Sequence, residues 1–285
     1  MSAAIPQAKT SADETGQASP PTGETARHRG PEPHIRLVGI ELSYGDTLVQ
    51  RGLSFTINRG DVFVIMGGSG CGKSTVMRCL TGLLEPRAGE VLMDDVSLWR
   101  VSPAQRARLM RRNGVMYQSG ALWSSMTLRE NVALPLEQYT DLPAGQIRDI
   151  AELKLALVGL AGFGDYYPAE ISGGMRKRVG VARAMALDPQ TLFFDEPSAG
   201  LDPISARRLD DLILELRDSL GTTMVVISHE LESIFRIGDD SVFLDADSKT
   251  MLTTGSPREL RAHSEIAQVR AFLNRGETND DADRA

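Results

Sequence analysis

One short segment constrains the fold of this chain more than any other. Residues 67–74 read GGSGCGKS and match the pattern G-x-x-x-x-G-K-[ST]. The apolar run VFVIM at residues 62–66 precedes it and predicts a buried strand, and residues 75–83 after it predict a helix. In that context the glycines let backbone N–H groups close around phosphate oxygens, and the helix N-terminus adds a favourable dipole. The segment therefore predicts a phosphate-binding loop for a nucleoside triphosphate.

Strands and helices alternate along the rest of the chain. The predicted strands are residues 35–42 with an irregularity near Gly39, 53–57, 62–66, 115–117, 191–194 and 223–227. The helix predicted between the last two carries Leu209, Leu212, Ile213 and Leu216 on one face. Residues 119–175 predict a helical lobe, with a stripe formed by Ile147, Ile150, Leu153 and Leu157. This alternation indicates an α/β domain with a mostly parallel sheet.

The two ends of the chain have a different composition. Residues 1–33 are rich in small and polar residues, so we predict a disordered tail without a secretory signal, and we predict the same for the polar end from residue 276. Within the extension at 261–285, Val269, Phe272 and Leu273 form an apolar stripe that either contacts a neighbouring copy or packs on its own domain. No window approaches the run of about 18 apolar residues of a membrane-spanning helix. The net charge of −7 disfavours nucleic acid as a partner.

A pair of carboxylates supplies the chemistry that the phosphate loop lacks. Asp195 ends the apolar strand at residues 191–194, where we expect it to position Mg²⁺, and Glu196 follows, where it can orient or deprotonate an attacking water. In the loop, Lys73 is expected to reach the β- and γ-phosphates and Ser74 to ligate Mg²⁺. These residues therefore predict Mg²⁺ beside the phosphates of a nucleoside triphosphate.

The segment ISGGM at residues 171–175, followed by Arg176, Lys177, Arg178 and then Ala-Arg-Ala, resembles the signature motif of ABC ATPases. The other motifs of that family occur in the expected order. Tyr44 matches the aromatic residue that stacks on adenine, and Gln118 matches the glutamine-loop residue that touches Mg²⁺ and the attacking water. Asp202 matches the last residue of the D-loop SAGLD, and His229 matches the switch histidine that contacts the γ-phosphate. The resemblance covers about residues 35–260. It implies an α/β P-loop NTPase of ABC type over residues 34–260, with a mostly parallel sheet core, a helical lobe and an antiparallel β subdomain.

The resemblance also implies ATP and Mg²⁺ as the cofactors, and a set of site residues. Those with catalytic roles are Glu196, His229 and Gln118, and those at the metal are Ser74, Gln118 and Asp195. Those that bind the nucleotide are Tyr44, Gly67, Gly68, Ser69, Gly70, Cys71, Gly72, Lys73, Ser74, Thr75, Ser172, Gly173, Gly174 and Asp202. In this family the signature glycines contact the γ-phosphate bound by the other protomer, so the resemblance implies a head-to-tail dimer with two shared sites.

One residue of the signature motif departs from the usual spelling, because Met175 stands where the family usually has Gln. With the segments GALWSSMT at residues 120–127 and ENVALPL at 130–136, the motif is similar to the ATPases of bacterial Mce/Mla-type lipid-trafficking systems. The similarity implies an ATPase that powers lipid transport at the cytoplasmic face of the inner membrane, through an MlaE-like permease and a Mce-type substrate-binding protein. Residues 120–136 would meet the coupling helix of the permease, with an apolar surface of Leu122, Trp123, Met126 and Leu128 that alternatively packs the helical lobe.

Other functions are compatible with parts of this sequence. An ABC transporter for another substrate is the main alternative, because permease and binding protein select the substrate. Soluble ABC ATPases of translation carry two cassettes, and those of DNA repair place a long coiled coil between the nucleotide half-motifs. This chain has one cassette, and Lys73 and Asp195 lie only 122 residues apart. An ATPase for iron–sulfur cluster assembly shares the cassette but has no positive support in the sequence.

Overall fold

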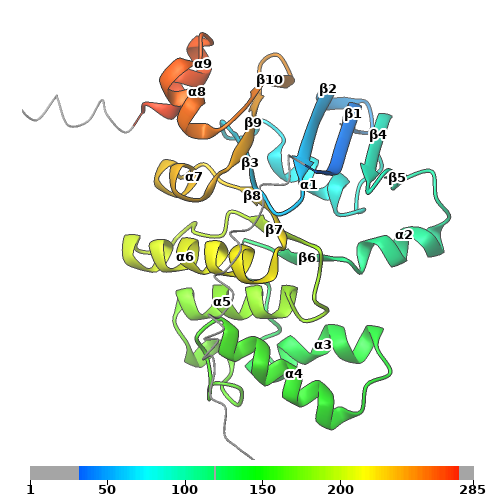
Figure 1. Ribbon diagram of the computed structural model, residues 1–285, viewed down its shortest axis with the longest axis vertical. Coiled ribbons are helices and arrows are strands. Elements are labelled where there is room, and N and C mark those ends of the chain that lie inside the picture. The colour runs from blue at the N-terminus through cyan, green and yellow to red at the C-terminus, as the bar shows by residue number, and fades with distance from the viewer. Residues whose placement is uncertain (1–31, 119, 276–285) are drawn as a thin grey trace, which may run out of the picture. The chain divides into compact units, whose positions relative to one another are not determined.

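Two β-sheets form the centre of the fold in the computed structural model, which describes residues 32–118 and 120–275 (Figure 1). The predicted tails at 1–33 and from 276 lie outside these ranges, apart from residues 32 and 33. The core sheet has the strand order β10-β9-β3-β8-β7-β6. Its strands are β3 (Val62–Gly67), β6 (Asn113–Met116), β7 (Thr191–Asp195), β8 (Thr223–Ile227), β9 (Asp240–Asp245) and β10 (Thr250–Thr254). All neighbours in it are parallel except β10 and β9, which confirms the mostly parallel core.

The second sheet is antiparallel and has the order β2-β1-β4-β5. Its strands are β1 (Pro33–Tyr44), β2 (Thr47–Asn58), β4 (Ala88–Met93) and β5 (Val96–Ser97). The pairing of β1 with β2 shifts register between Leu37 and Ile40, and Gly39 between them has a φ of +61°. This bulge is the irregularity that the sequence predicted near Gly39.

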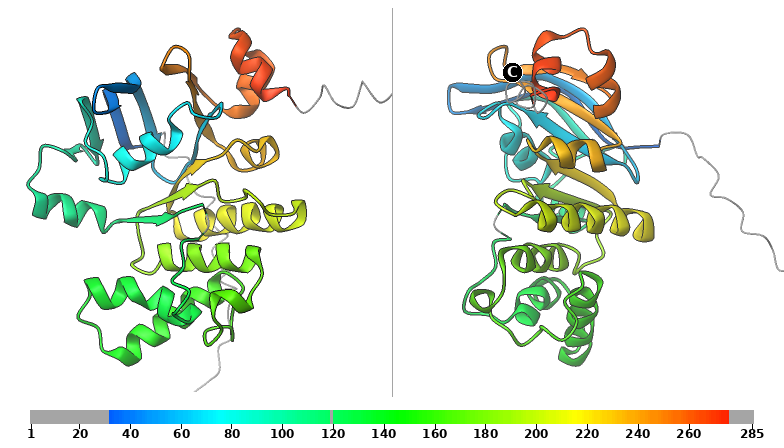
Figure 2. Two further views of the ribbon diagram at one scale, coloured as in Figure 1. Left: turned by 180° about the vertical axis from the view of Figure 1, so that it is seen from behind. Right: turned by 90° about the vertical axis from the view of Figure 1, so that its left-hand side faces the viewer.

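Helices cover both faces of the core sheet. They are α1 (Lys73–Leu80), α2 (Pro103–Met110), α3 (Leu128–Tyr139), α4 (Ala144–Leu157), α5 (Gly173–Ala184), α6 (Pro203–Leu220), α7 (Leu231–Ile237), α8 (Pro257–His263) and α9 (Ala267–Leu273), with a 3-10 turn at Pro168–Glu170. Figures 1 and 2 show the green helices α3–α5 gathered beyond β6, away from the blue strands of the antiparallel sheet. Among the described residues, no helix has the length and apolar character to cross a bilayer.

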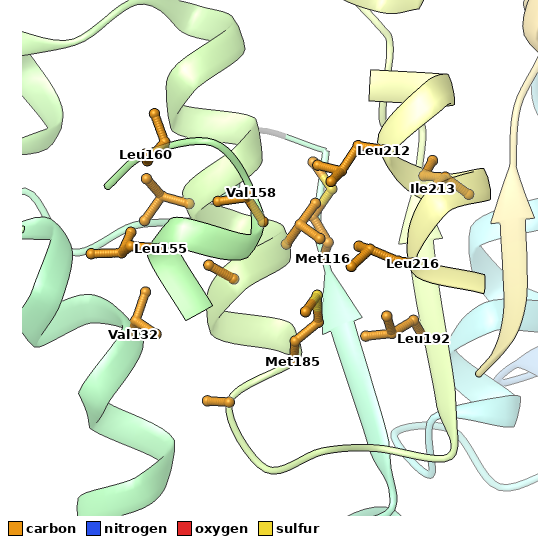
Figure 3. Close-up of a cluster of buried hydrophobic side chains, with 14 of the residues drawn as sticks. Met116, Val132, Leu155, Val158, Leu160, Met185, Leu192, Leu212, Ile213 and Leu216 are labelled. Carbon is orange, nitrogen blue, oxygen red and sulfur yellow. The ribbon is translucent and has the colours of Figure 1, made fainter. Parts of the chain in front are cut away.

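Side chains alternate between the two faces of the core sheet and divide the interior into two large clusters. Phe193 and Val225 point to one face and pack against α1 and the antiparallel sheet. Their neighbours Leu192 and Val226 point to the other face, where α3–α6 cover them. Figure 3 shows this second cluster, in which Met116 and Leu192 of the sheet meet residues of the lobe and of α6: Val132, Leu155, Val158, Leu160, Met185, Leu212, Ile213 and Leu216.

The predicted stripe on α4 is partly wrong. Ile147 is buried, but Leu153 and Leu157 are 56% and 42% exposed. The buried face instead runs through Ala151 and Leu155. An apolar helix offers more than one stripe of helical period, and the packing of α4 against α3 and α5 selects one of them.

The C-terminal helix α9 packs on its own domain. Val269 and Leu273 are buried in a third cluster with Val64 and Met66 of β3. The Phe272 ring meets Phe243 of β9 edge to face, with 5.2 Å between ring centroids. Of the two alternatives for this apolar stripe, the structure shows packing within the chain.

Candidate nucleotide-binding site

The register of three parallel strands determines which loops meet. Strand β8 lies between β3 and β7, with Ile65 of β3 and Asp195 of β7 both opposite Ile227. The segments that follow these three strands therefore leave the sheet side by side at its carboxyl edge. They are the phosphate loop, the Asp195–Glu196 pair and the turn that carries His229.

The phosphate loop depends on glycine at its first position. Gly67 has a φ of +146°, and a Cβ placed there would lie 2.3 Å from the carbonyl oxygen of Leu244. Only glycine lets the chain turn out of β3 this close to β9. The ammonium of Lys73 donates to the carbonyl oxygens of Gly67 and Gly68 at 3.0 Å each, so it lies across the loop.

A cavity of about 560 Å³ opens at this edge of the sheet. Its lining residues come from all three loops, the segment after β6, strand β2 and the segment after α9. They are Val49, Gly67, Gly68, Ser69, Gly70, Gly72, Lys73, Ser74, Thr75, Gln118, Glu196, His229 and Arg275. The structure thus brings together most of the predicted nucleotide-binding residues with the three predicted catalytic side chains.

Glu196 and His229 contact each other in this cavity. Nδ1 of His229 lies 2.8 Å from Oε1 and 2.7 Å from Oε2 of Glu196. The backbone of Glu196 has a φ of +49°, in the left-handed region, and its N–H donates to the carbonyl of Ile227 at 3.0 Å. This turn points the carboxylate into the cavity immediately after the buried strand.

Asp195 lies beside Ser74 and is not one of the residues that line the cavity. Burial raises the pKa of Asp195, the negative charge of Glu196 raises it further, and a hydrogen bond with the side chain of Ser74 opposes the shift. Among the described residues, no group of three or more His, Cys, Asp and Glu side chains could hold a metal ion. The candidate metal donors are instead the oxygens of Ser74, Gln118 and Asp195, a hard set that suits Mg²⁺.

Besides Asp195 and the signature segment, three predicted residues lie outside the cavity lining. The ring of Tyr44 is 46% exposed at the end of β1, and its hydroxyl accepts from Arg78 at 2.9 Å. The Asp202 carboxylate caps α6 by accepting from the backbone N–H groups of residues 204 and 205. The thiol of Cys71 points into the core, where burial raises its pKa.

The signature segment also lies outside this cavity. Ser172 is exposed and caps α5, accepting from the N–H of Met175 at 3.2 Å, and Gly173 and Gly174 form the first residues of the helix. The Met175 side chain is partly buried against the cluster of the helical lobe. The unusual residue of the motif therefore contributes packing, where a Gln would place a polar amide.

Sequence analysis missed two residues of the cavity. Val49 of β2 lies against the loop, where a Cβ on Gly72 would come within 2.8 Å of it. Arg275 follows α9, packs over the ring of Phe272 and donates to the carbonyl of His229. Only the tertiary fold brings these segments to the cavity, and no local pattern in the sequence marks them.

Comparisons with known proteins agree with this geometry. The family model described as ABC transporter matches residues 50–199. The probable ribonucleotide transport ATP-binding protein mkl of Mycobacterium tuberculosis is 38% identical over 84% of this chain, which spans 66% of the length of that relative. The intermembrane phospholipid transport system ATP-binding protein MlaF of Escherichia coli K12 is 38% identical over 82% of this chain and 86% of its own.

Solved structures show the same fold. The cbiO1 protein of Clostridium perfringens, part of the ABC transporter complex cbiONQ, superposes with a TM-score of 0.76 at 25% identity, covering 88% of this chain and 99% of its own. The ATP-binding cassette MJ0796, in a dimeric post-hydrolysis state bound to ADP and Pi, gives a TM-score of 0.70 at 26% identity over 78% of this chain and 98% of that chain. With its phosphate loop, paired carboxylates and signature helix in this arrangement, the chain belongs to the ABC transporter family.

Proposed function

We propose that this chain is the ATP-hydrolysing subunit of a membrane transporter that moves a phospholipid or a related lipid through a separate permease. The cavity that unites the phosphate loop with Gln118, Glu196 and His229 carries the ATPase part of the proposal. Similarity to MlaF, over 86% of the length of that protein, supports the lipid part. Transport of a ribonucleotide is the second candidate, because the mycobacterial relative is named for it at the same identity.

In the proposed mechanism the protein mainly positions groups and neutralises charge. Lys73 and the backbone N–H groups of the loop hold the phosphates, and Glu196 accepts a proton from the attacking water. His229, which contacts Glu196, lies where it can donate to the γ-phosphate. Ser74, Gln118 and Asp195 would hold Mg²⁺, which when bound withdraws charge from the phosphate oxygens.

The raised pKa of Asp195 predicts a pH-dependent requirement for Mg²⁺. Mg²⁺ binds the ionised carboxylate, and a raised pKa means that this form is lost at a higher pH than for an exposed aspartate. We expect the increase in affinity that Mg²⁺ gives to a fluorescent ATP analogue to shrink as the pH falls, and to do so at a higher pH than an exposed aspartate would cause. Asp195→Asn should make that increase smaller and less dependent on pH. An increase that is independent of pH in the unmodified chain would contradict the prediction.

The proposal includes a second copy of the chain and an MlaE-like permease linked to a Mce-type protein, at the cytoplasmic face of the inner membrane. The dimeric state of MJ0796 supports the first of these partners. A contact with the permease is supported by the side chain of Trp123, which is 58% exposed. The loop that carries Trp123 is held by the side-chain amide of Asn131, which accepts from the backbone N–H of Trp123 and donates to its carbonyl. Leu128 is fully buried and packs the lobe, so it is not part of that surface. Leu122 and Met126, on the same loop as Trp123, are partly buried.

We expect Trp123→Ala to uncouple ATP hydrolysis from the permease. Loss of an exposed aromatic anchor weakens an interface by about 2 kcal/mol or more when it lies at the centre. The variant should copurify with less permease, and the permease should stimulate its ATP hydrolysis less. The isolated variant should keep the wild-type ATPase rate. Leu220→Ala, which removes another exposed apolar side chain at the end of α6, is the matched control. Equal copurification by the Trp123 variant would argue against this docking surface.

Purification of the assembled transporter tests the function as a whole. The tagged chain should copurify with an integral membrane protein, and mass spectrometry of the complex should find bound phospholipid. Reconstituted complex should move fluorescent phospholipid between membranes in the presence of ATP, but not with Glu196→Gln. A complex that binds and moves a nucleotide instead would favour the second candidate.

A further inference from the structure

Lys177 is a buried lysine whose ammonium binds backbone carbonyl oxygens. It lies one turn into α5 and is 6% exposed. Its Nζ donates to the carbonyl oxygens of Pro197 at 2.5 Å, Ala199 at 2.6 Å and Glu196 at 3.4 Å. Burial lowers the pKa of Lys177, against the charges of Glu230 and Glu196. An ammonium has three N–H donors, and here all three carbonyl acceptors belong to one turn.

That turn is the one that carries the candidate base. Glu196 has a φ of +49°, a conformation that a residue with a Cβ adopts only when its surroundings impose it. The N–H of Glu196 donates to the carbonyl of Ile227 in β8, whereas the carbonyl of Glu196 and those of the next residues lie beyond the end of strand β7. Lys177 is the side chain that binds them from the other side. The strained turn is therefore held between a strand of the core sheet and the signature helix.

We propose that Lys177 is a positioning residue for Glu196, acting through the backbone of residues 196–199. The inference rests on the proposed role of Glu196 as the general base. It also assigns a second task to α5. Ser172, Gly173 and Gly174 at its start would meet the nucleotide of the partner, and Lys177 one turn later holds the base of the chain's own site. One helix thus connects the two sites of the proposed dimer.

The test compares variants of Lys177 in the full-length chain. Lys177→Met keeps most of the buried apolar stem and removes the donors. We expect kcat to fall about 10- to 100-fold, the effect of a displaced catalytic group, while affinity for a fluorescent ATP analogue stays within about twofold. Lys177→Gln, whose amide again donates, should recover a large part of kcat. Lys154→Met is the matched control: Lys154 is 5% exposed and pairs with Asp188 in the helical lobe, so kcat should be unchanged.

A double-mutant cycle separates positioning from general damage. If Lys177 acts through Glu196, adding Lys177→Met to Glu196→Gln costs little further activity in single-turnover measurements, because the base is already gone. Full additivity of the two losses would overturn the inference, as would a Lys177→Met chain with a wild-type kcat. If Lys177→Met does not fold, Lys177→Leu, which also lacks the donors, takes its place in the same cycle with the same expected and contradicting results. If Glu196→Gln hydrolyses ATP normally, the role of Glu196 itself fails, which is a different result.

Discussion

Replacing Glu196 by Gln lowers kcat for ATP hydrolysis by about 100- to 10,000-fold, the usual contribution of a general base. The carboxylate ends a turn that aims it into the cavity, and the amide has nearly the same shape but cannot take a proton. ATP binding is expected to persist, because removal of a negative charge beside the phosphates reduces repulsion. The measurement is phosphate release at saturating ATP, together with size-exclusion chromatography to detect an ATP-stabilised dimer.

The control for this experiment is a neighbouring carboxylate. Glu230 lies just after His229, occupies the residue before the first turn of α7 and is not part of the cavity lining. Glu230→Gln changes the local charge by the same amount and should leave kcat within about threefold of wild type. Hydrolysis by Glu196→Gln near the wild-type rate would exclude Glu196 as the base.

Two inactive variants, when paired in one dimer, restore about half of the wild-type activity if each site is shared between two chains. The first variant, Lys73→Ala, removes the charge that lies across the phosphate loop. The second, Gly174→Asp, puts a carboxylate at the start of α5, where it repels phosphate. An acidic residue in the first turn favours the helix, and a Cβ at Gly174 meets Ser205 only at an ordinary 3.6 Å, so the fold is kept.

Mixed dimers are isolated with two different tags, one on each variant. In the shared arrangement one site collects both defects and the other site is intact. The matched dimer of Lys73→Ala with wild type also has one intact site, so the two mixed dimers should hydrolyse ATP equally fast. If each chain instead forms a complete site by itself, the doubly mutant dimer is as inactive as its parents. Gly174→Ser, neutral and small, checks that the charge causes the defect.

The strands that end at the site could be predicted because their signals are local. An uninterrupted apolar run marks β3, β7 and β8 as buried on both faces, and the polar residues after them have to meet at one edge of a parallel sheet. The family resemblance then located Gln118 and His229, which the structure places in the cavity.

Contacts made between distant segments could not be predicted in this way. Arg275 reaches the cavity because α9 packs on β3, and the bonds of Lys177 to residues 196–199 depend on the position of α5 against the sheet. The carboxylate of Asp202 caps the first turn of α6, a contact that the motif does not predict, and its role at the nucleotide stays a prediction. On α4, apolar residues occur on two faces, and only the neighbouring helices decide which one is buried.

The cluster in Figure 3 has a consequence for how the lobe folds and moves. Leu155 and Val158 of the lobe share one continuous apolar interior with Leu192 of β7 and Leu212 of α6. Expressed as a separate fragment, residues 128–184 would expose to water the apolar side chains that pack against the sheet and α6, so we expect the fragment to aggregate or to remain a loosely packed globule. In the intact chain the same continuity limits motion, because close-packed side chains allow small sliding steps and resist a wide hinge. We therefore expect the helices that would face the permease to move together with the sheet that holds the nucleotide.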